Sequence, residues 1–577
     1  MRFPRASGVL LHPTSLPGPH GSGDLGREAY HFVDWLVAGG QKLWQVLPLA
    51  GIGPGNSPYM SNSAFAGNVL LVDLAELHEQ GWLEAADLQP VPGLAAEAVD
   101  YAVVHPFRME RLHKAALRFA AAGTATQREA FAAFRAEQAS WLPDFSLFMS
   151  LCERLHWADW HTWPAPLRHR EPAALAAARA EHAERVHFWE FAQWCFFRQW
   201  LKLRAYANAK GVQVIGDTPI FIAYLSAEVW ANQHLFELDA EGQPSVVAGV
   251  PPDFFSATGQ RWGNPLYRWS EHAKDGYAWW VERIRRTFEL VDIVRIDHFR
   301  GFAGYWEIPA SEPTAIQGEW KPGPGAALFK AIAKALGPMP IIAEDLGVIT
   351  PDVDALRKQF GLPGMRILQF AFGGDATDRF LPHNHEPDTV VYTGTHDNDT
   401  VAGWWSTASD HERHFARGYL ATDGHDMPWT MIRAAMASVA DTAVHPMQDV
   451  LALPTACRMN YPGQESGWWR WRFQWGEVQP WHAGRLAELC RLYGRSAAAR
   501  AAARRRAPPS GSPGSCAAPA RRPGPGPRPG AAAGPGRRAA SPRPAARSRH
   551  RGSAPPAHWP RRPRCRPRRR TARPTAG

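Results

Sequence analysis

Short runs of apolar residues recur along the chain, and each run is followed by polar residues or by residues typical of turns. Such runs are typical of strands that are buried on both faces, as in a parallel sheet covered by helices. The eight runs are Gly8–Leu11, Lys42–Leu47, Val212–Ile215, Val291–Ile296, Pro340–Ala343, Ile367–Ala371, Thr389–Tyr392 and Val450–Leu453.

Helical patterns lie between several of these runs, among them His187–Asn208 and Phe329–Leu336. Alternation of strand and helix favours right-handed βαβ units, and eight such strands fit one closed barrel. A chain of 577 residues is long enough for such a barrel with insertions. We therefore predict an α/β fold, a (β/α)8 TIM barrel.

Two intervals are too long to be simple crossovers between strands. Residues 51–184 are rich in Ala and helical in character, and residues 219–277 are rich in Gly, Pro and aromatic residues. We expect both to be subdomains, mainly helical, inserted at the functional rim of a catalytic domain that spans residues 1–494. The sequence after Leu453 shows no series of short alternating strands, so we expect no C-terminal β-domain.

The last segment, residues 495–577, consists mainly of Ala, Arg, Pro and Gly. It contains too few large apolar side chains to offset the entropy of an ordered chain, so we predict that it is disordered. One interpretation is a basic arm that binds nucleic acid or an anionic surface. The alternative is a frameshift product, because these four residue types share GC-rich codons.

The charge of the chain is divided unevenly between these two parts. The formal net charge is +10, but residues 495–577 hold 22 Arg and no acidic residue. Residues 1–494 therefore carry 42 basic and 54 acidic side chains, which gives no support for nucleic-acid binding by the body.

Neither the N-terminus nor the cysteines indicate export. The apolar run before Pro13 is too short for a signal peptide, and no stretch approaches the roughly 20 apolar residues that span a membrane. Four of the six cysteines lie in the body without CxxC spacing, which favours ordinary buried thiols over zinc or disulfides. We expect a cytoplasmic protein.

Acidic residues follow several of the predicted strands. They are Asp217, Asp297, Glu344 and Asp397. A single acid at such a place is more often a helix cap or part of a salt bridge. The carboxyl ends of the strands of a parallel barrel all face one rim, however, so we expect these four to converge there.

Clustered carboxylates serve either metal binding or glycoside chemistry, and His298 and His396 keep the metal alternative open. The 26 Trp residues, several of them near the expected rim, favour sugar binding, because flat aromatic faces stack on sugar rings. Arg295 lies two residues before Asp297, so both side chains point to the same side of a strand. The guanidinium would hold the carboxylate ionised, as a nucleophile requires.

The other two acids suit the remaining roles of a glycoside-cleaving site. Glu344 follows an apolar run, where partial desolvation would raise its pKa, as a proton donor requires. Asp397, beside His396, would bind substrate hydroxyls and favour a distorted, oxocarbenium-like sugar.

Several stretches together identify a family that the chain resembles. They are GVLLHPTSLPG, NSPYMSNSAFAGN, GDTPIF, GVPPDFFSATGQRWGNPLY, VRIDHFRGF, AEDLG, TGTHDNDT and RMNYPG. In this order they resemble the 4-α-glucanotransferases, or amylomaltases, of the α-amylase clan, from about Gly8 to Gly494.

The resemblance implies a retaining transfer of α-1,4-glucan segments without cofactor or metal. It implies that Asp297 is the nucleophile, Glu344 the general acid/base and Asp397 the transition-state stabiliser. It also implies that maltooligosaccharides and other 1,4-α-glucans are the partners and that eight further residues contact them. These residues are Tyr59, Asp217, Gln260, Trp262, Arg295, His298, His396 and Asn460.

Three alternatives stay open at this point. A related α-glucan hydrolase would carry the same acids, and a glucan-binding protein without catalysis would be expected to have lost at least one of them. A nucleic-acid binder would depend on the basic tail.

Overall fold

The computed structural model describes residues 3–252, 256–464 and 466–496. Its central feature is a sheet of eight parallel strands, arranged in the order β10-β11-β12-β1-β2-β3-β6-β9. The ring closes between β9 and β10, where the Ala343 N–H donates to the Pro363 carbonyl at 2.9 Å. The predicted (β/α)8 barrel is thus confirmed. Its strands are β1 (Ala6–Leu10), β2 (Leu43–Gln45), β3 (Gln213–Pro219), β6 (Ile293–Asp297), β9 (Ile341–Ala343), β10 (Gly364–Ile367), β11 (Thr389–Tyr392) and β12 (Thr442–Pro446).

Alternate residues of these strands serve two separate cores. Leu10, Ile215 and Ile293 belong to the core inside the barrel. Their neighbours Val9 and Val214 belong to the core between the strands and the surrounding helices. Because both faces of each strand are buried, most of these strands appear in the sequence as continuous apolar runs. The helices between strands are α1 (Arg27–Ala38), α8 (Ala183–Ala209), α11 (Ala278–Leu290), α12 (Gly325–Leu336), α13 (Pro351–Gln359), α14 (Val401–Thr407), α15 (Asp410–Leu420) and α16 (Met427–Ala437).

Two of the eight predicted strands are wrong in position. The run Ile367–Ala371 contributes only its first residue to β10, and Leu368–Phe370 forms a 3-10 turn. The run Val450–Leu453 is no strand, since Val450 ends the short helix α17 (Met447–Val450) and is apolar because it packs in the core. The true eighth strand, β12, contains Thr, His and Pro, so its sequence does not stand out as apolar.

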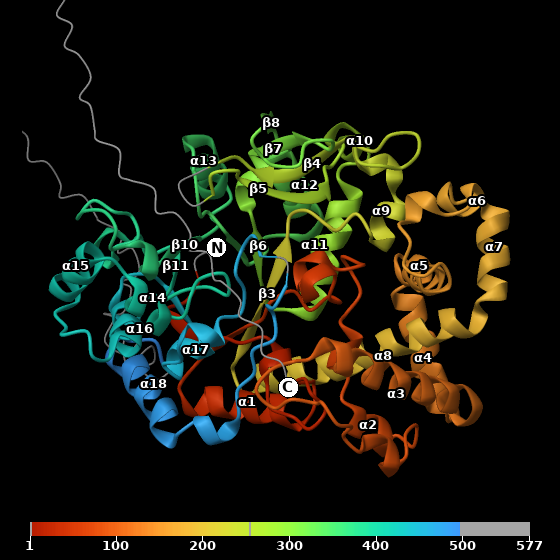
Figure 1. Cartoon of the computed structure of the whole chain (residues 1–577), viewed down its shortest axis with the longest axis horizontal. Helices are drawn as coiled ribbons and strands as arrows, with labels where there is room; N and C mark the ends of the chain where they lie inside the picture. Colours follow the sequence, from red (N-terminus) through yellow and green to blue (C-terminus); the bar gives the residue numbers. More distant parts are fainter. Residues whose placement is uncertain (1–2, 253–255, 465, 497–577) are drawn as a thin grey trace, which may run out of the picture. The chain divides into compact units, whose positions relative to one another are not determined.

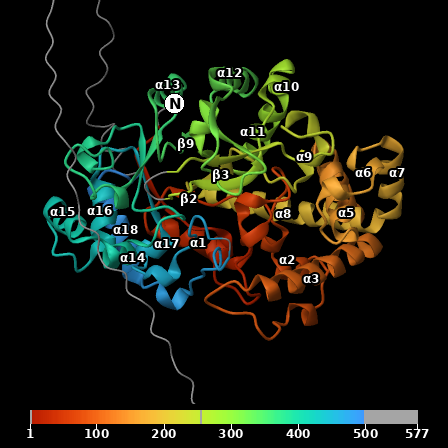
Figure 2. The same cartoon turned by 45° about the horizontal axis from the view of Figure 1, so that its top comes forward.

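The first insertion is helical, as predicted, and Figure 1 shows its helices α3 to α7, in orange, on one side of the barrel. Helices α14 to α16 lie on the opposite side, and Figure 2 shows the same separation from a second direction. The long helix α8 leads from the insertion back to β3. The helices of this insertion are α2 (Leu74–Glu79), α3 (Tyr101–Ala122), α4 (Ala125–Glu137), α5 (Leu142–Arg154), α6 (Ala165–Arg168) and α7 (Pro172–Glu181).

The second insertion carries two short helices and part of an antiparallel sheet that the sequence analysis did not foresee. Its helices are α9 (Ala227–Ala231) and α10 (Trp269–Lys274), and its strands are β4 (Val246–Val250) and β5 (Gln260–Pro265). These strands join β7 (Gly304–Pro309) and β8 (Glu319–Pro322), which follow β6 in the chain, in the order β5-β4-β7-β8. The sheet therefore joins the insertion to the chain that continues from β6.

No strand occurs among the described residues after Pro446, in agreement with the predicted lack of a C-terminal β-domain. This part contains α17 and α18 (Pro480–Leu492). Residues 497–577, predicted to be disordered, lie outside the described residues.

The predicted start of the tail is wrong at Arg495, which belongs to the folded body. Its side chain is fully buried and donates to backbone carbonyls around the C-terminal end of α16 and the start of β1. The last carbonyls of a helix lack partners within the helix, so a buried guanidinium satisfies several of them at once. The carbonyls belong to Ala6, Ala435, Met436, Ser438, Ala440 and Asp441.

Candidate active site

The four acids singled out in the sequence lie at the carboxyl ends of barrel strands. Asp217 is in β3 and Asp297 is the last residue of β6. Glu344 directly follows β9, and Asp397 lies in the loop between β11 and α14. Because all eight strands are parallel, these ends share one rim, as the sequence predicted.

Arg295 joins two of these acids. Its Nη1 donates to both carboxylate oxygens of Asp217, at 2.8 and 2.7 Å, and its Nη2 lies 2.9 Å from Asp297 Oδ1. Burial lowers the pKa of Arg295, but the charges of Asp217 and Asp297 outweigh this and raise the pKa overall. A fixed positive charge therefore lies beside Asp297, and the predicted same-side pairing of Arg295 with Asp297 is confirmed.

Glu344 lies in a different environment. Its Oε2 accepts the N–H of His298 and its Oε1 accepts the N–H of Leu346, both at 2.7 Å. His298 has the left-handed backbone angles φ 54° and ψ 47°, a strained conformation of the kind found at functional sites. Burial raises the pKa of Glu344 to about 8, and the negative charge of Asp297 adds to the rise. The expected desolvation of this carboxyl is confirmed.

Asp397 is held by side chains from the segment that follows β12. Its Oδ1 accepts Nδ2 of Asn460 at 2.6 Å, and its Oδ2 lies 3.4 Å from Nε2 of His396. Its backbone carbonyl accepts the guanidinium of Arg458. The Asp397 side chain is 41% exposed, so the carboxylate is fixed and still open to a ligand.

Three aromatic side chains, Tyr59, His396 and Trp469, pack together between Asp397 and Asp217. The hydroxyl of Tyr59 donates to Asp217 Oδ2 at 3.0 Å. The ring of Tyr59 stacks on His396 with 5.2 Å between centroids and 16° between planes. Trp469 lies 5.8 Å from both rings.

Two residues of β5 complete the site from the antiparallel sheet. Trp262 donates its Nε1 to Gln260 Oε1 at 3.1 Å, and its ring is perpendicular to that of His298 at 4.8 Å. Burial lowers the pKa of His298 to about 4, so the imidazole is neutral. Its Nε2 is buried and has no hydrogen-bond partner among the described residues.

All eleven candidate residues are thus brought into one neighbourhood, and the structure adds two more. His12 lies two residues after β1 and directly follows the apolar run Gly8–Leu11, and burial lowers its pKa to about 3, with the charge of His396 adding to the effect. The rule used for the acids, a polar residue at a strand end, would have found it. Arg458 donates to the carbonyls of Asp397 and Asn460, but it lies in a loop and carries no such signal.

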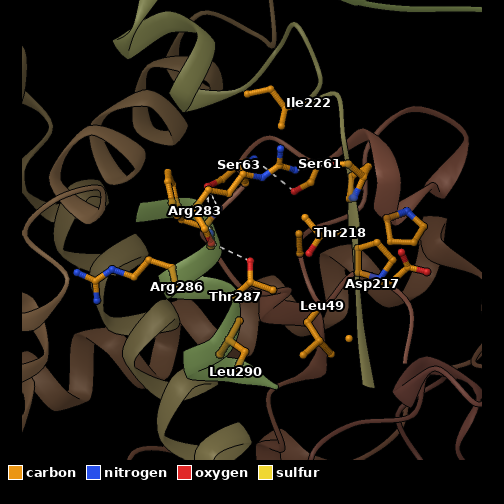
Figure 3. A pocket seen from close by; sticks show the side chains of 18 of the residues that line it. Leu49, Ser61, Ser63, Asp217, Thr218, Ile222, Arg283, Arg286, Thr287 and Leu290 are labelled. Atoms are coloured by element: carbon orange, nitrogen blue, oxygen red, sulfur yellow. Dashed lines mark hydrogen bonds between the residues drawn. The ribbon is translucent and has the colours of Figure 1, made fainter. Parts of the chain in front are cut away.

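A cavity of about 70 Å³ lies between β3, α11 and the loop after β2 (Figure 3). Thr218 and Leu49 line one side of it, and Arg286 and Thr287 line the other. It touches the site only at Asp217 and Tyr59 and is not lined by the other three acids. We therefore treat it as separate from the rim.

Two further observations concern metal ions and membranes. Among the described residues, no group of three or more His, Cys, Asp and Glu side chains is arranged to hold a metal ion. No helix in the same part of the chain is long and apolar enough to cross a membrane.

The cysteines of the described residues are free thiols. Cys152, Cys195 and Cys490 are buried, and Cys457 is half-buried.

Comparison with known proteins shows close relatives over the whole body. The 4-alpha-glucanotransferase of Thermus thermophilus is 52% identical over 497 residues, which cover 85% of this chain and 99% of that protein. The chloroplastic/amyloplastic enzyme of Arabidopsis thaliana is 47% identical over 499 residues, or 85% and 86% of the two chains. The amylomaltase of Streptococcus agalactiae, solved with acarbose, is 40% identical with a TM-score of 0.83, covering 85% of this chain and 100% of that chain. A family model described as 4-alpha-glucanotransferase matches residues 11–478, and the chain belongs to this family.

Proposed function

We propose that this enzyme transfers a segment of a 1,4-α-glucan to the 4-hydroxyl of an acceptor sugar by a retaining double displacement. The observation that carries the proposal is the contrast between two neighbouring acids. Asp297 lies beside the cation Arg295, whereas burial raises the pKa of Glu344 to about 8. One ionised and one protonated carboxyl at the scissile bond are what a retaining enzyme requires.

In the first step, the Asp297 carboxylate attacks the anomeric carbon while Glu344 protonates the leaving glucan oxygen. This yields a covalent glycosyl-enzyme, and Glu344 is left ionised. In the second step, Glu344 removes the proton of the acceptor 4-hydroxyl, whose oxygen displaces Asp297. Asp397 stabilises the oxocarbenium-like transition states, and its partial exposure leaves it open to sugar hydroxyls.

The other candidate residues bind glucan around this centre. Tyr59, Asp217, Arg295 and His396 line one side, and Asn460 holds Asp397. His298, whose buried Nε2 has no hydrogen-bond partner among the described residues, together with Gln260 and Trp262, contributes from the side of β5. We assign these roles to residues within a catalytic domain that spans residues 1–496, with insertions at about 51–184 and 219–277.

Maltooligosaccharides are the proposed substrates, supported by the chemistry of the site and by the acarbose bound to the Streptococcus agalactiae relative. We expect the reaction to be cytoplasmic and the body to bind no nucleic acid. Fractionation of cells and a nucleic-acid retention assay with and without residues 497–577 would test both expectations.

Incubation with maltotriose followed by chromatography tests the proposed reaction. We expect a ladder of longer maltooligosaccharides together with glucose. Maltose and glucose alone would indicate a hydrolase, and unchanged maltotriose would indicate a binding protein.

The matched variants are Asp297→Ala and Asp292→Ala. Asp292 lies at the opposite end of β6 and accepts the Val214 N–H at 2.8 Å. We expect Asp297→Ala to abolish the ladder and folded Asp292→Ala to retain it. A ladder from Asp297→Ala would rule out the assigned nucleophile.

A further inference from the structure

The loop that carries Asp397 is closed at its base by a second, buried acid, Asp449 in α17. Its Oδ2 accepts the hydroxyl of Thr393 at 2.6 Å, and its Oδ1 accepts the N–H of Val401 at 2.7 Å. Thr393 directly follows β11, and Val401 is the first residue of α14. One carboxylate therefore ties together the two ends of the loop 393–401.

The environment of Asp449 is buried and contains no opposite charge among the partners that bind its carboxylate. Its side chain is buried, with only 1% of the residue exposed. Burial raises the pKa of Asp449 to about 6, and the charged neighbour that adds to the rise is another acid, Asp399. Above that pH the group is an acceptor only, which suits its two donors. A buried carboxylate costs stability unless hydrogen bonds offset its desolvation, and here the two hydrogen bonds that offset it are those that join the ends of the loop.

The outer part of the same loop is held by the segment that follows α17. Arg458 donates to the Asp397 carbonyl, and Asn460 donates to the Asp397 carboxylate at 2.6 Å. Thr455 donates its hydroxyl to Asp399 Oδ2 at 2.9 Å. The base and the tip of the loop are thus fixed by one stretch of chain, and Asp449 supplies the contact at the base.

We propose that Asp449 is a positioning residue that fixes the Asp397 carboxylate against the reacting sugar by closing the loop 393–401. This inference rests on the role assigned to Asp397 under the proposed function. A displacement of about 1 Å at a catalytic group is enough to cost roughly 100-fold in rate. Asp449 itself touches no substrate and acts through the loop.

Initial transfer rates from maltotriose and from α-maltosyl fluoride test the proposal. We expect Asp449→Ala to lower kcat by about 10- to 100-fold with both donors, since Asp397 serves the transition state whatever the leaving group is. Asp449→Asn is expected to stay within about 3-fold of the unchanged enzyme, because its amide oxygen accepts the Val401 N–H and its NH2 donates to Thr393.

A double-mutant cycle with Asp397→Asn separates a positioning role of Asp449 from a loss of activity caused by a disturbed fold. We expect Asp449→Ala to add less than about 3-fold on the Asp397→Asn background, because the carboxylate that it positions is already gone. The control Asp292→Ala also removes an acid that accepts one backbone N–H, together with bonds from Arg204 and Asn208, but at the far end of the barrel. Its effect on kcat is expected to be small on both backgrounds.

The outcomes distinguish the two proposals. An Asp397→Asn variant with full activity would overturn the proposed role of Asp397 and the inference with it. A strongly impaired Asp397→Asn beside a fully active Asp449→Ala, or equal losses from Asp449→Ala on both backgrounds, would overturn the inference alone. If Asp449→Ala does not fold, Thr393→Val takes its place, with an expected loss of about 3- to 10-fold that disappears on the Asp397→Asn background.

Discussion

The two ends of the barrel place key charged groups in different environments. At the base, the guanidinium of Arg495 is enclosed by backbone carbonyls, and Arg5 donates to Met436, Ala440 and Tyr493 in the same region. At the rim, Asp297 and Asp397 keep part of their carboxylates exposed. Complete satisfaction of polar groups stabilises a fold, whereas groups left open to solvent are available for reaction. The comparison predicts that substitutions at the rim change rates and that those at the base change stability.

The largest expected effect is at the rim. Glu344→Ala should lower transfer from maltotriose by at least about 1,000-fold, because the leaving oxygen is no longer protonated. The unfolding temperature should not fall, because the substitution removes a buried carboxyl whose raised pKa lowers stability at neutral pH. Transfer from α-maltosyl fluoride should fall much less in the first step, since fluoride leaves without a proton. Equal losses with both donors, measured by single-turnover kinetics, would contradict the assignment of Glu344 as the acid.

The reverse pattern is expected at the base. Arg495→Ala removes the hydrogen bonds that this guanidinium donates to six buried carbonyls, although those of Met436, Ser438 and Ala440 keep Arg5 as a donor, and should lower the free energy of unfolding by about 2–4 kcal/mol, measured in urea. The kcat of the folded fraction should be unchanged. Chains that end at residue 494 and at residue 496 provide the matched pair, and only the shorter one should be destabilised. Equal stability of the two chains would contradict the structural role of Arg495.

The pH dependence sharpens the contrast between the two acids at the rim. Glu344 must be protonated to act on maltotriose, and its pKa is raised to about 8. The rate should therefore fall roughly tenfold per unit as pH rises beyond about 8. With α-maltosyl fluoride this fall should be absent from the first step. A decline at the same pH with both donors would assign it to another group.

The carboxyl of Glu344 also links stability to pH. Its pKa is about 8 in the folded protein and near its usual 4.5 when unfolded, so the folded state binds more protons between these values. Stability should fall as pH rises from about 4.5 to about 8 and level off above. Chemical denaturation across this range measures the effect.

The smallest expected effect concerns the support of Asp397. Asn460→Ala removes one hydrogen bond of 2.6 Å to this carboxylate and should lower kcat by about 5-fold. The unfolding temperature should shift by less than about 2 °C. A change in stability without a change in kcat would place Asn460 with the structural residues of the base instead.

The strand pattern and the strand-end acids were predictable because they follow local rules. A barrel strand is apolar along its whole length, and the residue that follows it faces the rim, so Asp297 and Glu344 stood out. Strand β12 did not, because its Thr442, His445 and Pro446 give no apolar run. Asp449 and Arg458 were not found, since their contacts join segments that only the tertiary fold brings together. The antiparallel sheet was missed because two of its strands lie on each side of β6 in the sequence.

The location of Arg495 has a consequence for folding during synthesis. The base of the barrel cannot be completed until residue 495 has left the ribosome, although β1, to which it binds, is made at the start. The contacts through which Arg495 joins β1 to the end of α16 therefore form only after nearly the whole body has been made, so the first and last parts of the body meet late in folding.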